Sequence, residues 1–235
     1  MNLLTLPKSL SSYNPIPNGC LLYLPLWNPG LSGSTFKSID PYGHLCTVTG
    51  ALYGSTGRTF DGADDLINCG SGASLDDIFD TGGTYLAWIN PSSDGEGDKG
   101  RVIEKANPSF FTTSEATGKV KMSFAQLFST LYGEWETTAT EVTIGTRTFV
   151  AVTYNSSSVA NNPIMYIDGV VKTVGSGLTE VSTPDGTRTS DAASDLIIGN
   201  NVGGTRSYAG IIETTWAYNR ILSAGEIEHI RQVTK

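Results

Sequence analysis

Residues 211–230, IIETTWAYNRILSAGEIEHI, join a long strand to a short helix and decide the fold class. Over residues 211–218, every second side chain of an extended strand points to the same side. The two predicted faces are Ile212, Thr214, Trp216 and Tyr218 on one side, and Ile211, Glu213, Thr215 and Ala217 on the other. Because both faces carry apolar groups, the pattern predicts a central strand that is covered on both sides.

The second half of this stretch predicts a helix that begins at Ser223. Ser223 and Glu226 have the spacing of a capping box, in which each side chain accepts a hydrogen bond from the other residue's backbone amide. Leu222 and Ile227 flank the cap as a hydrophobic staple, and Ile227 and Ile230 make a one-sided apolar stripe. The chain should therefore close with a short amphipathic helix against the strands.

Upstream, strand-like runs alternate with turns rich in Gly, Ser and Asp, at the spacing of a β-sandwich. In IMYIDGVVK, residues 164–172, the Asp168-Gly169 pair predicts a two-residue hairpin with positive φ at the turn. Five of the 10 prolines lie within the first 29 residues. Residues 1–17 are therefore predicted to form an irregular arm, and residues 18–235 a single domain.

Composition excludes several classes of protein. Charged residues make up only 16% of the chain and hydrophobic ones 39%, which argues against disorder and against a coiled coil. The net charge is −8 and the basic residues are scattered, so we expect no nucleic-acid partner. The sequence shows no signal peptide and no apolar run long enough to span a membrane, so we expect no membrane partner. If the protein acts outside the cell, we expect it on an extracellular surface or in a virion.

The order of the strand-like stretches resembles that of the laminin-G-like, concanavalin-A-type jelly-roll domains, which include the pentraxins. The resemblance covers residues 18–231. The stretches that carry it are LLYLPL (21–26), FDGADDLI (60–67), YLAWINP (85–91), RTFVAVTYN (147–155), MYIDG (165–169), LIIG (196–199) and YNRILS (218–223). It implies an all-β, two-sheet antiparallel jelly-roll sandwich with one short C-terminal helix. Such sandwiches include lectins, receptor-binding modules, hydrolases and virion parts, so each candidate site needs its own argument.

Catalytic residues are sparse. Glycosidases on this kind of sandwich place two carboxylates across the concave sheet. Glu134 and Glu136 would project to one side of a strand, but the hydrolase pattern of the family needs a third alternating acid, where Thr137-Thr138 follows instead. The two histidines, His44 and His229, offer little for a Ser-His-Asp site. We therefore predict that the chain is not an enzyme.

An acidic stretch gives one candidate metal site. No basic residue lies between Arg58 and Lys99, although many acids do. The resemblance places Asp64 and Asp65 where pentraxin-like relatives supply their first calcium ligands, and places the second half of that site at residues 200–203. There Asn200 and Asn201 offer amide oxygens but no carboxylate. The prediction is either no cofactor or one Ca²⁺ at Asp64 and Asp65, the alternative being that these acids form solvated turns.

The three cysteines, Cys20, Cys46 and Cys69, contain no CxxC pair, so zinc is not expected. Three free thiols, or one disulfide and one free thiol, remain open.

Two loops are candidate ligand-binding rims. Tyr132 and Trp135 lie in a polar segment where an aromatic ring has few apolar neighbours, and Asn200, Asn201 and Arg206 form a second rim. These residues favour a non-catalytic binding or adhesion module for a glycan or a protein surface. The alternative is a structural virion component, such as a decoration or fibre protein, that assembles as a homo-oligomer through its N-terminal arm. A polysaccharide hydrolase or lyase is the weaker alternative.

Overall fold

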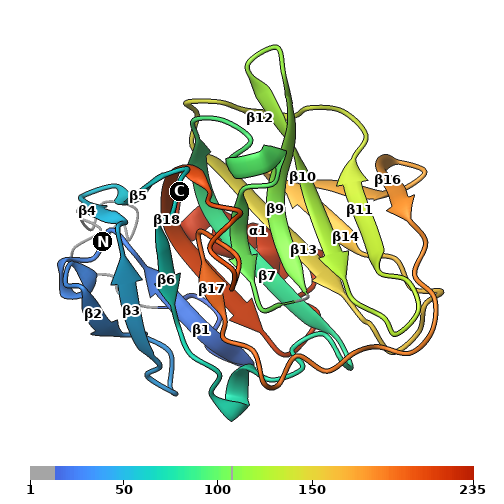
Figure 1. Cartoon of the computed structure of the whole chain (residues 1–235), viewed down its shortest axis with the longest axis horizontal. Helices are drawn as coiled ribbons and strands as arrows, with labels where there is room; N and C mark the ends of the chain where they lie inside the picture. The colour runs from blue at the N-terminus through green and yellow to red at the C-terminus, as the bar shows by residue number, and fades with distance from the viewer. Residues whose placement is uncertain (1–13, 107) are drawn as a thin grey trace.

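Two antiparallel sheets face each other in the computed structural model, which describes residues 14–106 and 108–235 (Figure 1). In the first sheet, β18 (Ala209–Tyr218) pairs on one side with β7 (Gly83–Pro91) and on the other with β1 (Cys20–Pro25) and β5 (Gly57–Asp61). On the β7 side the sheet continues through three more strands, and on the β5 side it ends with one more strand. These are β13 (Thr148–Tyr154), β14 (Ile164–Ile167) and β15 (Val170–Val174), and β4 (Leu52–Gly54).

The second sheet runs across the opposite layer. Its order is β2 (Thr35–Lys37), β3 (Leu45–Thr49), β6 (Leu66–Asn68), β17 (Ile197–Ile198), β8 (Arg101–Glu104), β9 (Ser109–Ala116), β10 (Lys119–Gln126), β11 (Gly133–Thr137) and β16 (Gly177–Ser182), with β12 (Val142–Thr143) beside the start of β10. A short parallel pairing of β15 with β16 joins the two sheets at one edge. The predicted all-β antiparallel sandwich is confirmed.

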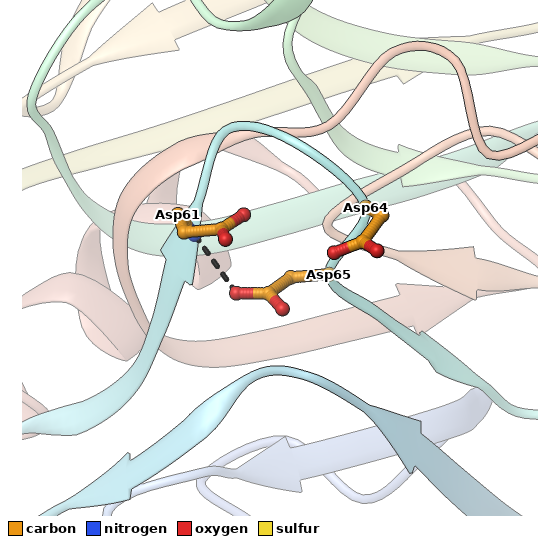
Figure 2. Close-up of side chains that lie close together, drawn as sticks. All are labelled: Asp61, Asp64 and Asp65. Atoms are coloured by element: carbon orange, nitrogen blue, oxygen red, sulfur yellow. Dashed lines mark hydrogen bonds between the residues drawn. The ribbon is translucent and has the colours of Figure 1, made fainter.

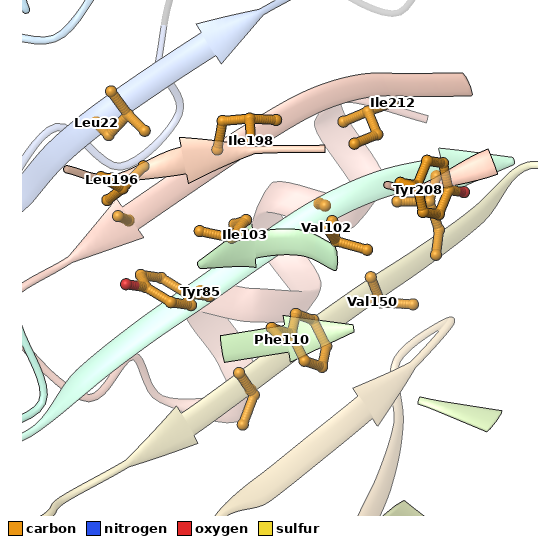
Figure 3. Packing of buried hydrophobic residues seen from close by; sticks show 14 of the residues in the cluster. Leu22, Tyr85, Val102, Ile103, Phe110, Val150, Leu196, Ile198, Tyr208 and Ile212 are labelled. Atoms are coloured by element: carbon orange, nitrogen blue, oxygen red, sulfur yellow. The ribbon is translucent and has the colours of Figure 1, made fainter. Parts of the chain in front are cut away.

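Two separate cores stabilise this arrangement. The main core fills the space between the sheets, and Figure 3 shows part of it, including Tyr85, Phe110 and Ile198. The second core lies between the outer face of the first sheet and the helix α1 (Ala224–Val233). It contains Cys20, Tyr23, Leu86, Trp88, Phe149, Ala151, Tyr166, Trp216, Tyr218, Leu222, Ile227 and Ile230. The central strands of the first sheet are therefore buried on both faces.

The two local predictions at the turn and the helix are confirmed. Asp168 and Gly169 both have positive φ, 49° and 84°, as a two-residue hairpin requires. At α1, the Glu226 amide donates to Ser223 Oγ (3.3 Å), and the Ser223 amide donates to Glu226 Oε2 (2.9 Å). Arg220 binds the same Glu226 carboxylate and lowers the pKa of Glu226 to about 2. The helix start is thus fixed by both its cap and an ion pair.

The predicted alternation along β18 is wrong at one point. The register of β18 against β7 shifts between Ile212 and Thr214, which leaves Glu213 as an extra residue. A β-bulge of this kind turns the following side chains to the other face. As a result Ile212 lies in the main core, whereas Trp216 lies in the second core under α1.

The described part of the arm is anchored, since Tyr218 Oη donates to the Ile16 carbonyl (2.9 Å). Residues 1–13 of the predicted arm lie outside the described residues. Among the described residues, no helix is long and apolar enough to cross a membrane.

Candidate functional site

Only one of the two aromatic residues predicted for ligand contact is available at the surface. Tyr132 is 41% exposed in the loop before β11. Trp135 is fully buried in the main core, stacked near Phe124 and Tyr154, and its indole N–H donates to Asn162 Oδ1 (2.9 Å). The prediction for Trp135 as a ligand contact is corrected, because strand alternation in β11 turns the ring inward while its two glutamate neighbours face outward.

The amides of the second rim are engaged within their own loop. Asn200 is fully buried, and its side-chain oxygen accepts the amide hydrogens of Asn201 (2.8 Å) and Arg206 (3.0 Å). Its NH₂ group donates to the Asp65 carbonyl (3.3 Å). The side-chain oxygen of Asn201 accepts the amide hydrogen of Thr205 (2.7 Å). The prediction for Asn200 as a ligand contact is therefore corrected: it holds the loop in place. Arg206 is half-buried beside the backbone of Gly97.

The two predicted rims lie at opposite ends of the sandwich. The segment just before Tyr132 is held near Arg188, which binds Asp77 and Asp80 just before β7 begins. The Arg206 loop instead binds the segment between β7 and β8, since the Glu96 amide donates to the Ser207 carbonyl (2.9 Å) and the Arg101 amide donates to the Arg206 carbonyl (3.0 Å). β7 has 9 residues, and a strand of that length spans about 27 Å. Tyr132 and Arg206 therefore do not form one site.

The acids predicted as metal ligands are brought together, and a third joins them. One side-chain oxygen from each of Asp61, Asp64 and Asp65 lies within 4.8 Å of the others (Figure 2). Asp65 accepts the Asp61 amide hydrogen (2.8 Å), and Asp61 accepts the Ala63 amide hydrogen (2.8 Å). Burial, and after it the neighbouring charges of Asp61 and Asp64, raise the pKa of Asp65, against the lowering effect of the Asp61 amide. Two of the three carboxylates thus shape the turn.

The two amides predicted to complete the calcium site are engaged within their own loop. Ca²⁺ requires six to eight oxygen ligands. The oxygen of Asn200 already accepts two backbone amides, and the group that Asn200 turns toward Asp65 is its NH₂. The oxygen of Asn201 is held by Thr205. The second half of the expected site therefore does not reach the carboxylates.

The outer face of the second sheet carries the pair of glutamates that the sequence placed on one side of a strand. Glu134 pairs in register with Ala125 and Glu136 with Ser123, so both carboxylates project outward from β11. Each lies beside a lysine: Lys99 is 3.6 Å from Glu134, and Lys121 is 2.6 Å from Glu136. Both carboxylates are therefore neutralised by cations.

A third carboxylate on this face, Glu104, was not singled out from the sequence. Glu104 is buried, and burial raises its pKa although Arg101 Nε donates to it at 2.5 Å. Glu104 and Glu134 lie three strands apart in one register row, which separates their Cα atoms by about 14 Å. A bulge between Arg101 and Ile103 brings Arg101 and Glu104 to the same face, so strict alternation could not have revealed the pair.

A pocket of about 280 Å³ opens on the outer face of the first sheet, and none of its residues was predicted as a site. It lies where the β4–β5 turn meets β7 and β18. Its lining is Ser55, Thr56, Ile89, Asn90, Arg147, Ile211 and Glu213. Glu213 directly follows Ile212, which lies in the main core, so its buried side chain points to the outer face.

One ion pair organises this pocket, which we call the Arg147 pocket. The guanidinium of Arg147 binds both carboxylate oxygens of Glu213, with Nη2 2.8 Å from Oε1. It also lies 3.5 Å from the ring centroid of Trp88 and donates to the Thr234 carbonyl (2.9 Å). These contacts fix Arg147 from three sides and cancel its charge. The pocket thus offers amide, hydroxyl and guanidinium groups without a net charge.

Comparisons with known proteins agree with this architecture. A family profile described as the concanavalin A-like lectin/glucanases superfamily matches residues 61–228. No curated protein sequence matches the chain. The binding domain of botulinum neurotoxin serotype D has a similar structure, with a TM-score of 0.65 and 14% identity, over 93% of this chain and 52% of that one.

Two further structures are similar. The binding domain of Paraclostridial Mosquitocidal Protein 1 has a TM-score of 0.59 and 12% identity, over 92% of this chain and 52% of that one. Trypanosoma rangeli sialidase in complex with sialic acid has a TM-score of 0.62 and 14% identity, over 91% of this chain and 32% of that one. The chain therefore spans from a third to half of these proteins, and identities this low show the fold alone. Because the family profile matches most of its length and both sheets and the closing helix are present, the chain belongs to the concanavalin A-like lectin/glucanases superfamily.

Proposed function

We propose that this chain is a non-catalytic binding module that recognises a glycan through the Arg147 pocket. The observation that carries the proposal is the lining of the pocket, where Asn90, Ser55 and Thr56 surround the neutralised Arg147–Glu213 pair. Sugar hydroxyls both donate and accept hydrogen bonds, and amide and hydroxyl side chains do the same. The volume lies just below the range for pockets that hold drug-sized ligands, which suits one sugar unit better.

Two further considerations support binding without catalysis. The similar structures include the binding domains of two toxins. The outward-facing carboxylates of the second sheet are each paired with a cation, and Glu104 and Glu134 are widely separated. Burial raises the pKa of Glu104, but a glycosidase also needs a second carboxyl group close to the protonated one. We therefore propose that hydrolysis is not the activity of this sheet.

A glycan array with the purified chain tests this function. We expect Asn90→Ala to weaken binding of the captured glycan up to about tenfold, because the variant loses hydrogen bonds that contribute roughly 0.5–1.5 kcal/mol each. Asn90 is half-buried at the pocket wall, so its truncation should leave the melting temperature within about 1 °C of wild type, as for other half-buried surface positions.

Tyr132→Ala is the matched control, because Tyr132 lies beyond the opposite end of β7 and should leave that binding unchanged. Loss of binding in Tyr132→Ala but not in Asn90→Ala would move the site to the predicted loop. If no glycan is captured and the chain forms closed oligomers, a structural virion component replaces the glycan-binding module as the proposed function.

We also propose that the fold does not depend on calcium. A variant of Asp65 in the acidic turn first measures what the charge of this residue does to stability. With its pKa raised above 3.8, Asp65 binds a proton more readily in the folded state, so its contribution to stability falls as the pH rises through the folded pKa. Asp65→Asn removes this penalty and keeps an acceptor for the Asp61 amide. We expect the variant to melt higher than wild type at pH 7 and the difference to close below pH 4.

The same melts with millimolar Ca²⁺ or a chelator test the metal directly, with Asp98→Asn as an exposed acidic control outside the cluster. We expect the wild-type midpoint to be the same in both media. A rise with Ca²⁺ in wild type that Asp65→Asn abolishes would establish a calcium site at this turn.

A further inference from the structure

Two of the three cysteines lie opposite each other on neighbouring strands. Cys46 is in β3 and Cys69 directly follows β6, and the register that pairs Thr47 with Asn68 places these two cysteines across from one another. Their sulfur atoms are 3.5 Å apart. Both side chains are buried in the main core. Directly opposite residues of antiparallel strands have Cα atoms roughly 4.5–5.5 Å apart, within the range that a disulfide spans.

Cys20 is excluded from this pairing by its position. It lies in the second core, on the other side of the first sheet, and its thiol donates to the Leu22 carbonyl (3.3 Å). Of the three pairings that three cysteines allow, the structure thus supports one.

We propose that Cys46 and Cys69 are a cross-linking site that becomes a disulfide when the chain folds in the presence of a small-molecule disulfide such as oxidised glutathione. One thiolate attacks the glutathione disulfide, releases one glutathione thiol and forms a mixed disulfide. The second protein thiolate then displaces the other glutathione. The protein loses two protons and two electrons, and one oxidised glutathione becomes two reduced molecules.

The burial of the pair determines when this exchange occurs. The hydrogen bond with Cys46 and burial both raise the pKa of the Cys69 thiol well above its usual range. The thiolate is the species that attacks, so exchange is slow once the two sheets have closed over the pair. The cross-link forms during folding, and afterwards the same burial protects it from reductants. The presence or absence of the disulfide in the folded protein therefore depends on whether the chain folded in an oxidising or a reducing medium.

Refolding the full chain from denaturant tests the proposal. One sample refolds with oxidised and reduced glutathione, and the other with a phosphine reductant. In the oxidised sample we expect a mass about 2 Da lower, a peptide pair that joins Cys46 to Cys69, and one thiol that reacts after denaturation. We also expect its melting temperature to rise by about 5–10 °C, because the cross-link restricts the unfolded chain.

Cys20→Ala is the matched control and should keep both the cross-link and the higher midpoint, whereas Cys46→Ala should lose both. If Cys46→Ala fails to refold, the thiol count and the peptide map of the wild-type chain still decide the question. Three reactive thiols in the oxidised sample, or a cross-link that includes Cys20, would overturn the proposal.

Discussion

Trp135→Ala lowers the free energy of unfolding by about 3–5 kcal/mol, the usual cost of truncating a buried tryptophan. The ring is fully buried between the sheets and packs against Tyr154, with ring centroids 5.2 Å apart. Truncation leaves a cavity in the main core and leaves the Asn162 side chain without its indole donor. For a chain of this length, we expect the melting temperature to fall by about 10 °C.

Thermal melts of Trp135→Phe provide the control. Phenylalanine keeps most of the ring volume and loses part of the indole together with the hydrogen bond to Asn162, so we expect a smaller loss, about 1–2 kcal/mol. If Trp135→Ala melts at the wild-type temperature and binds its ligand differently, the Trp135 ring lies at the surface and not in the core. Because the variant is destabilised, it is unsuitable as a test of ligand binding, and Tyr132→Ala and Asn90→Ala serve that purpose.

Trp135 also shows where sequence patterns lose their power. Alternation correctly placed Glu134 and Glu136 on one face of β11, and the same rule places Trp135 on the other. Which face is the core depends on the neighbours, and one of them, β16, was not predicted. Its residues, GLTEVS, lie between short segments that contain Gly and Ser, and they were not among the strands that the pattern indicated. The polar context of Trp135 was therefore mistaken for an exposed one.

Features fixed by neighbouring residues were predictable, whereas those fixed across strands were not. The capping box at Ser223 and the Asp168-Gly169 hairpin depend on a few adjacent residues, and both are confirmed. The bulges at Glu213 and after Arg101 are mismatches between paired strands that are distant in sequence. The bulge after Arg101 brings two charged side chains to one face. The Arg147 pocket is lined by segments that are distant in sequence, so no local pattern could have assembled it.

Lys105→Met is the second large effect, because Lys105 is a fully buried cation between distant segments. Its ammonium group lies 3.2 Å from Asp76 and 3.4 Å from Asp191, and donates to the carbonyls of Asp191 (3.0 Å) and Ser194 (2.8 Å). Methionine keeps the length of the chain and removes the charge. The buried Asp191 carboxylate would then face no cation, so we expect a loss of about 3–5 kcal/mol at pH 7.

The pH dependence identifies the cause of that loss. Burial already raises the pKa of Asp191, and removal of Lys105, whose charge lowers that pKa, raises it further. A raised folded pKa means that stability decreases as the pH rises from 3.8 through the folded value, and that protonation at lower pH restores it. Urea unfolding should therefore show a difference in the free energy of unfolding between wild type and Lys105→Met that narrows from pH 7 to pH 4.5.

Two further variants separate charge from packing. Adding Asp191→Asn to Lys105→Met should recover part of the lost free energy of unfolding at pH 7. Lys121→Met, which breaks the more exposed pair with Glu136, should cost less than about 1 kcal/mol. A gap of equal size at both pH values would mean that lost packing, rather than the uncompensated carboxylate, destabilises the variant.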